Sequence, residues 1–521
     1  MARIGKNVLE SLTRSMYADS KCVYREYIQN AADQIDAAKQ LYPELEYNVF
    51  VKINPHKRNI IIEDDATGVP ENQVEALLID VARSIKERGK NKGFRGIGRL
   101  GGLAYCKTLK FETSYFGENS ISIVTWDAVL LNHILDDEND DRDAGEVIDA
   151  ITTITHEHTE ETRDKHFFRV IMEDVTDDKL LIEKDIRNYL AMVAPVDYSN
   201  HFVYRNDIYG FMKKHNLHLD CYTIYVGEYQ LSKDYTISIL DPKGQEEDKI
   251  TGVEFWYEED SEGIPMYWGW YAISGLKGVI SITNNARNIR LRCENIQLGN
   301  EEACLRFLPN DKQKFVRWFF GEIHVISSNK LLPNSQRDYL REDVALKEFE
   351  DSVQENFLKL EKLCYLASNL RSEEKIVNQA NKKEEEIRNK RKKGFNSKEE
   401  EKKLEAEFRD WLQKKEASVK KLQKMQRQME ETNSPLLPIF NPLGITNPQN
   451  YVLPEKSNAT PNNNKVEQKN SNLRVDKPIY NKFQPKEKEL ITKIYSIIAD
   501  TLPNNSLCDA IIERIETEIT K

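Results

Sequence analysis

Residues 23–38, which read VYREYIQNAADQIDAA, most constrain how this chain folds. Ala, Gln, Arg and Glu favour a helix and nothing in the stretch interrupts one, so it predicts an α-helix. At about 100° per residue, Glu26, Asn30 and Asp33 fall on one narrow stripe. The apolar residues face the opposite way and supply a packing surface. The helix therefore presents two acids and an amide on one side, with a solvated polar face as the ordinary alternative.

Strand and turn signals follow this helix. Two short apolar runs at residues 49–53 and 60–62 flank a polar turn and predict a β-hairpin. The second run leads into an acidic turn, DDATGVP, that begins at Asp64. The next segments predict a helix at 71–87, a basic glycine-rich stretch at 88–106 with helix at its end, strands at 109–116, 120–127, 151–155 and 167–175, and a helix at 182–195.

The region after residue 200 is rich in β-branched and aromatic residues, which are typical of strands. The runs that predict strands are 222–231, 235–241, 252–259, 267–275, 278–283, 288–299 and the end of 314–327. The composition then changes to Glu, Lys, Arg, Gln, Leu and Ala, with Gly394 as the obvious break. This part predicts long helices that form a hairpin or coiled coil, with a solvated single helix as the alternative.

These changes of composition predict five regions in an α+β chain. They are a first α/β unit at 1–197, a strand-rich unit at 198–345, a charged helical arm or coiled coil at 346–432, a disordered linker rich in Asn and Pro at 433–484, and a short amphipathic helical tail at 485–521. The tail is too small to fold alone, so we expect it to dock on a partner, on its dimer mate or on the body.

Charge and cysteine content exclude several classes of protein. The net charge of -11 argues against a general nucleic-acid coat. We see no signal peptide and no apolar stretch of about eighteen residues, so we expect no contact with a membrane. The seven cysteines are scattered singly, without the close pairs of a zinc site. Reduced thiols in a cytoplasm are the expectation.

A glycine loop at residues 93–98 is the third feature to set beside the helix and the acidic turn. It reads GFRGIG and opens a predicted helix. Glycines there let backbone N–H groups approach phosphate oxygens, and the helix dipole favours an anion. Alone the pattern is weak, because a tight loop or close helix packing would look the same. Its order after the other two features carries the weight.

That order resembles the GHKL ATPase superfamily of gyrase, heat-shock chaperones, histidine kinases and MutL. The family's first motif, E-x-x-x-N-x-x-D, is present in full as Glu26, Asn30 and Asp33. Its second, D-x-G-x-G, is DDATG here, with Ala66 in place of the first glycine. Its third, G-x-x-G-x-G, is complete at 93–98. The resemblance covers about residues 1–345 and implies a Bergerat-type α/β sandwich followed by a transducer-like α/β domain.

The resemblance also implies ATP and Mg²⁺ as cofactors and a role for each motif residue. Asp64, or its neighbour Asp65, would accept a hydrogen bond from the adenine amino group, and the strand register favours Asp64. Asn30 would supply an oxygen to Mg²⁺. Glu26 would act as general base on the attacking water, and Asp33 would support the site.

The remaining binding residues come from the acidic turn and the lid segment. Gly68 completes the turn, and the loop Gly93, Arg95, Gly96, Ile97 and Gly98 would wrap the phosphates. Lys86, Lys90, Lys92 and Arg95 are the cations available to neutralise them, and the sequence does not single one out.

A second catalytic residue is suggested by LLPNSQRD at residues 331–338. It resembles the middle-domain loop of the chaperones, in which an arginine before an acid reaches the γ-phosphate. Arg337 is therefore the candidate arginine finger, and an ordinary Arg–Asp surface contact is the alternative.

The layout of ATPase, transducer and charged helices is similar to heat-shock-chaperone and microrchidia-type proteins. It implies a slow ATPase in which ATP closes a lid and dimerises the N-terminal domains as a molecular clamp. A nucleotide-sensing scaffold, or a DNA-acting clamp like MutL, is the alternative, and a role in microbial stress or anti-phage defence suits either. We expect a homodimer and a protein partner on the arm or tail. Basic clusters at 382–383 and 388–393 could touch nucleic acid, but a solvated helix is preferred.

Overall fold

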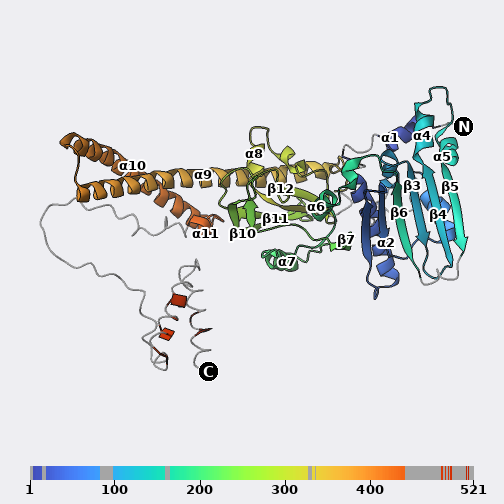
Figure 1. The fold of residues 1–521 in the computed structure, drawn as a ribbon, viewed down its shortest axis with the longest axis horizontal. Coiled ribbons are helices and arrows are strands. Elements are labelled where there is room, and N and C mark those ends of the chain that lie inside the picture. Colours follow the sequence, from blue (N-terminus) through green and yellow to red (C-terminus); the bar gives the residue numbers. More distant parts are fainter. Residues whose placement is uncertain are drawn as a thin grey trace. The chain divides into compact units, whose positions relative to one another are not determined.

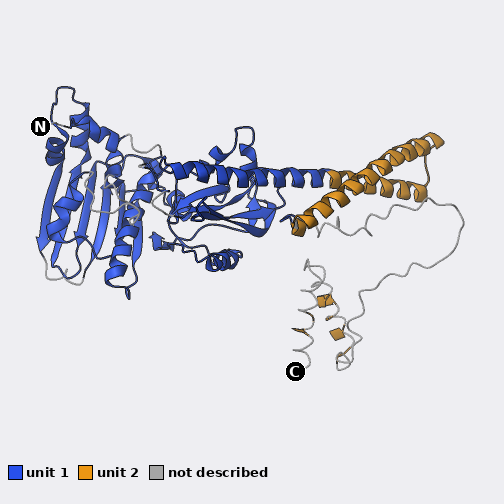
Figure 2. Ribbon diagram, turned by 180° about the vertical axis from the view of Figure 1, so that it is seen from behind, with its two compact units in different colours: residues 1–372, 434–436 blue, residues 373–433, 437–521 orange. Residues whose placement is uncertain are grey.

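The computed structural model describes residues 4–14, 19–81, 98–158, 165–326, 331–334 and 336–440, with a few more between 483 and 515. The chain forms two compact units (Figure 2). One unit holds residues 1–372 with 434–436, and the other holds 373–433 with 437–521. Two sheets with helices confirm the predicted α+β class. The five regional boundaries remain predictions.

The first sheet has eight strands in the order β5-β4-β3-β6-β2-β1-β7-β8 (Figure 1). The strands are β1 (Asn48–Asn54), β2 (Asn59–Asp64), β3 (Thr108–Ser114), β4 (Ser120–Asp127), β5 (Thr152–His158), β6 (Phe167–Glu173), β7 (Thr223–Val226) and β8 (Tyr229–Gln230). Neighbours are antiparallel except β1 and β7, which run parallel. Burial alternates along β1 to β4, so helices cover one face of this sheet.

Helices and short 3-10 turns pack against this sheet. They are α1 (Asn7–Leu12), α2 (Cys22–Leu41), η1 (Glu71–Gln73), α3 (Val74–Leu78), η2 (Gly98–Ala104), α4 (Ala128–Asp136), α5 (Ala144–Ile151), η4 (Asp178–Leu181) and α6 (Glu183–Val193). The next helix, α7 (Arg205–Lys214), packs instead on the second sheet of this unit, where Phe211 stacks on Phe255 with ring centroids 4.4 Å apart. The motif helix, the hairpin and the strands around residues 109–127 and 167–173 are confirmed. The helix expected at 97–106 is a 3-10 helix instead, because glycines let the chain pack tightly on α2.

The second sheet also belongs to the first unit, and its order is β13-β12-β14-β11-β10-β9. Its elements are β9 (Ser238–Leu240), β10 (Glu246–Glu259), β11 (Pro265–Ser274), β12 (Asn288–Cys293), β13 (Ile296–Gln297), η5 (Ala303–Phe307), α8 (Gln313–Val316) and β14 (Phe320–Val325). The strand expected at 278–283 is wrong. That segment is a loop, and Ile282 within it is 77% exposed.

A buried charged cluster lies inside the second sheet. Glu322 pairs with Lys233 at 2.8 Å, with Arg292 at 2.6 Å and with His324 at 2.9 Å, and it accepts a hydrogen bond from Tyr198. Burial alone would raise the pKa of Glu322, but Arg292 and Lys233 outweigh it and hold that pKa well below its usual range. Burial lowers the pKa of Lys233 to about 8 and that of His324 to about 4.

The charged arm consists of α9 (Val344–Lys393) and α10 (Lys398–Glu431), followed by α11 (Leu437–Phe440). The first part of α9 packs on the second sheet, where Phe349 meets Tyr267 with ring centroids 5.3 Å apart. Gly394 ends α9 with φ +89°. The chain then folds back, and Arg391 pairs with Glu405 at 3.0 Å. The described part of the arm is therefore a helical hairpin. The expected linker lies almost wholly, and the tail mostly, outside the described residues.

Candidate functional site

The polar stripe of α2 lies between the first sheet and η2. Glu26 and Asp33 are buried, at 9% and 4% exposed, and Asn30 between them is half-buried. Carboxylates are seldom buried to this extent without a partner or a function. The stripe is therefore not the solvated polar face that the sequence left as an alternative.

Gly98 brings the end of the glycine loop against Glu26. A Cβ on Gly98 would come within 2.6 Å of Glu26 Oε2. Glycine is thus required for the backbone to approach the carboxylate so closely. The first and third sequence motifs therefore meet in space.

Tyr27 holds this arrangement from the next position on α2. Its hydroxyl donates to the carbonyl of Arg99 at 3.0 Å and accepts from the N–H of Gly102 at 3.0 Å. Any side chain at Gly102 would collide with this hydroxyl, since a Cβ there would lie 2.3 Å away. Burial lowers the pKa of Arg99 to about 10. The sequence does not single out Tyr27 or Arg99, because a tyrosine on a helix usually belongs to the hydrophobic core.

The acidic turn separates the roles of its two aspartates. Asp65 accepts hydrogen bonds from the backbone and side-chain N–H groups of Asn48, at 2.5 and 2.9 Å, and so closes the hairpin. Asp64 ends β2 at 2% exposed, and its Oδ1 accepts from the N–H of Ala66 at 3.2 Å. This geometry favours Asp64 over Asp65 as the residue that reads a ligand.

The glycine that closes the turn has no substitute. Gly68 has φ +74°, and a Cβ would lie 2.0 Å from the carbonyl oxygen of Ser114 at the end of β3. Thr113 beside it accepts from the N–H of Val69 at 2.8 Å. By contrast, Ala66 is not among the described residues with positive φ. The alanine in place of the family's first glycine therefore does not require a backbone conformation that favours glycine.

The phosphate-binding part of the prediction lies outside the described residues. This concerns Lys86, Lys90, Lys92, Gly93, Arg95, Gly96 and Ile97, all within 82–97. Only Gly98 of that group is described, and it lies beside Glu26. The choice among the lid cations stays open.

The segment that carries Arg337 approaches α2 from the second sheet. Arg25, next to Glu26, pairs with Glu26 Oε1 at 3.3 Å and donates from Nη2 to the carbonyl of Gln336 at 3.2 Å. Arg337 follows with φ +52° and is 7% exposed, and its Nη1 has no hydrogen-bond partner among the described residues. An ordinary surface contact would require neither the burial nor the positive φ of Arg337. Arg25 was missed because its contacts depend on this distant segment.

These groups suit a magnesium nucleotide. Mg²⁺ prefers oxygen ligands, takes few of them from protein and uses phosphate oxygens for the rest, and Asn30 offers one half-buried amide on the same stripe as Glu26. The described residues hold no group of three His, Cys, Asp or Glu side chains placed to bind a metal ion. In the part of the chain that is described, no helix is long and apolar enough to cross a membrane.

Comparison with known families shows which family this part of the chain is similar to. Residues 17–159 match the family described as histidine kinase-, DNA gyrase B-, and HSP90-like ATPase. The matched segment runs from just before α2 to the end of β5, so it contains Glu26, Asn30, Asp64 and the glycine loop. No curated protein matches the chain.

Proposed function

The segment at residues 17–159 is a GHKL ATPase domain, and from that premise we propose that the chain is a slow, Mg²⁺-dependent ATPase whose nucleotide drives a molecular clamp. The reaction converts ATP and water to ADP and phosphate. ATP binding follows from the family; hydrolysis by this chain, closure and dimerisation are the parts that we propose.

The observation that supports the proposal most directly is the pair of contacts made by the Arg25 side chain. Its guanidinium pairs with Glu26 at 3.3 Å and donates to the carbonyl of Gln336 at 3.2 Å. One side chain thus connects the acid of the ATPase helix to the segment that positions Arg337. This supports a site completed by both sheets of the first unit, as a transducer arrangement requires.

Each residue then has a role in the reaction. Bound ATP would supply the phosphoryl group, and bound Mg²⁺ would neutralise part of the negative charge on its phosphates. Asp64 accepts the adenine amino hydrogen, and Asn30 offers its oxygen to the metal. Glu26 orients the attacking water and takes its proton. Arg337 stabilises the charge on the transferred group.

Closure of the lid and association of two N-terminal domains are the proposed output of the ATP cycle. The arm would offer such a clamp a surface for a protein partner or client, because it is a helical hairpin with charged faces. We also propose a cytoplasmic location, since Cys22, Cys106, Cys221, Cys304 and Cys364 are all reduced thiols.

The test compares the purified chain with Glu26→Ala. We measure ATP hydrolysis, nucleotide affinity, and mass by light scattering with and without a non-hydrolysable ATP analogue. The proposal expects the native chain to turn over and the variant to bind ATP, stop hydrolysing and accumulate as a dimer. A chain that binds ATP without hydrolysis or dimerisation would be a nucleotide-sensing scaffold, and a chain that does not bind ATP would contradict both.

A further inference from the structure

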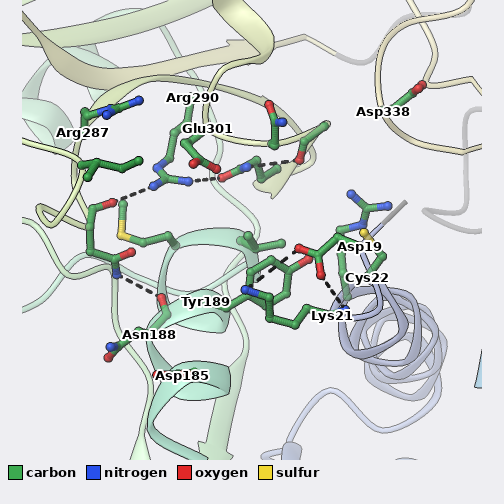
Figure 3. Close-up of a pocket in the computed structure, with 18 of the residues that line it drawn as sticks. Asp19, Lys21, Cys22, Asp185, Asn188, Tyr189, Arg287, Arg290, Glu301 and Asp338 are labelled. Atoms are coloured by element: carbon green, nitrogen blue, oxygen red, sulfur yellow. Dashed lines mark hydrogen bonds and ion pairs between the residues drawn. The ribbon is translucent and has the colours of Figure 1, made fainter. Parts of the chain in front are cut away.

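A cavity lies in the first unit, between α2 and α6 on one side and the loops around β12 on the other. Its volume is about 670 Å³, and none of the proposed reaction residues lines it. Figure 3 shows Arg287 and Arg290 on one side, Tyr189 below them, and Asp19, Lys21 and Cys22 on the other side. A cavity of this size accommodates a small organic molecule.

Arg290 is the unusual residue of this cavity. It is only 6% exposed, yet among the described residues it forms no ion pair. Two neutral acceptors hold its guanidinium: Gln297 Oε1 and the carbonyl of Asn285, each at 2.6 Å (Figure 3). A guanidinium has five N–H donors, so three have no acceptor in the described structure, and one of them, Nε, is wholly buried.

Arg292, two residues along the same strand, shows what a buried arginine normally requires. It is fully buried and pairs with Glu322 at 2.6 Å. Burial of a charge without an opposite charge is costly, and arginine cannot escape by losing its proton. Burial lowers the pKa of Arg290, which is the sign of a cation without sufficient compensation.

Nearby acids supply only part of that compensation: Glu301 and Glu322 each raise the pKa of Arg290, but burial outweighs them. Asp19, Asp185 and Asp338 are exposed, and Glu301 is half-buried. Lys21 lies 4.0 Å from Asp19, and Arg287 already pairs with Glu302 at 2.7 Å. The three aspartates are therefore solvated at the edge of the cavity, and Arg290 lies in its wall without an ion-pair partner among the described residues.

We propose that this cavity binds a phosphate group through Arg290, with the amides of the lining residues Asn284 and Asn300 available to the remaining oxygens. The planar guanidinium matches the geometry of a phosphate, and hydrogen bonds between the two are charge-assisted. The group is either orthophosphate, which the chain itself would release under the proposed function, or the phosphate of a small metabolite.

The cavity also touches the helix that carries the catalytic acid. Arg25 lines it and pairs with Glu26 at 3.3 Å. A ligand bound here would contact both the ATPase helix and the second sheet. Phosphate in this cavity is thus placed to act on the nucleotide site without occupying it.

The test is calorimetric titration of the full chain, saturated with Mg²⁺ and a non-hydrolysable ATP analogue, with orthophosphate and separately with ribose 5-phosphate. No hydrolysis is involved, so the result does not depend on turnover. Arg290→Gln should weaken binding roughly tenfold to a hundredfold, the loss expected for hydrogen bonds to a charged group. Arg409→Gln, which removes an exposed arginine of the arm, should change nothing.

The two probes distinguish the sources of phosphate. Binding of orthophosphate identifies the released product as the ligand, and binding of ribose 5-phosphate alone identifies a separate metabolite. Binding of neither, or equal binding by the native chain and Arg290→Gln, overturns the proposal. If Arg290→Gln does not fold, Arg290→Lys keeps the buried charge but loses the planar donors, and unchanged affinity in that variant overturns the proposal equally.

Discussion

Gly68 and Ala66 occupy two glycine positions of one motif, but only Gly68 has a backbone conformation that favours glycine. Gly68 has φ +74° and no room for a Cβ beside the carbonyl of Ser114. Gly68→Ala should therefore destabilise the chain by about 2–4 kcal/mol, because strain and overlap add. Urea unfolding measures this change.

Ala66→Gly is the matched control. It restores the family's glycine at a position with no positive φ, so we expect a change of no more than about 1 kcal/mol and an unchanged ATP affinity. A large gain in ATP affinity would show that the alanine weakens the pocket after all.

Gly98 should affect turnover rather than folding. In Gly98→Ala the new methyl would meet Glu26 Oε2 at 2.6 Å and push the carboxylate aside. We expect the rate of hydrolysis to fall roughly tenfold to a hundredfold, as for other small displacements of a catalytic group, with ATP still bound. Gly210→Ala adds the same methyl with nothing within 4 Å and should leave the rate unchanged. Equal rates in the native chain, Gly98→Ala and Gly210→Ala would contradict the role of Glu26 as general base.

Local spacing explains which site residues the sequence could indicate. Glu26, Asn30 and Asp33 share one helix, so their common stripe follows from helix geometry alone. The strand register already favours Asp64 over Asp65, and the hydrogen bonds from Asn48 to Asp65 agree with it. Arg25 could be recognised only by its contact with Gln336. Contacts between residues far apart in the chain leave no periodic signal.

Within the second sheet, the His324 ring should make stability depend on pH. The neutral ring donates to Glu322 and stacks on Trp268, and burial lowers the pKa of His324 to about 4. An unfolded histidine titrates near 6.5, so between these values the unfolded chain binds the extra proton. Stability from this group is complete above about pH 6.5 and is lost as pH falls toward 4, by about 2 kcal/mol between pH 7 and pH 5.

The measurement is urea unfolding at pH 7 and pH 5 for the native chain and for His324→Gln, which retains an N–H donor. The difference between the two proteins should shrink at the lower pH as the native chain loses its advantage. The same pH dependence in both proteins would mean that other groups titrate.

The sequence predicts the elements with strong hydrophobic periodicity. It does not predict those that depend on a helix cap or on pairing with another strand. Helices α4 and α5 were missed; their N-terminal ends are fixed by Asp127 and Asp143, whose side chains accept from backbone N–H groups. The run at 278–283 has strand composition, but no strand of the sheet pairs with it, and it remains a loop. Strand composition alone does not supply a pairing partner.

At the scale of the first unit, Arg337 should separate binding from chemistry. Arg337→Ala should lower the rate of hydrolysis roughly a hundredfold or more, because the charge on the transferred group loses a cation, and should leave ATP affinity within a few-fold. Arg341→Ala, four residues on and paired with Asp343 at 3.4 Å, is the control. A normal rate in Arg337→Ala would mean that the arginine is structural.

The path of the chain through the first sheet has a practical consequence. The sequence predicts a boundary at residue 197, yet β7, at Thr223–Val226, is the strand that pairs with β1. A fragment that ends at the predicted boundary would bare one whole hydrogen-bonding side of β1. Such open edges recruit other chains, so a minimal soluble ATPase fragment should extend past Gln230, and shorter ones should aggregate.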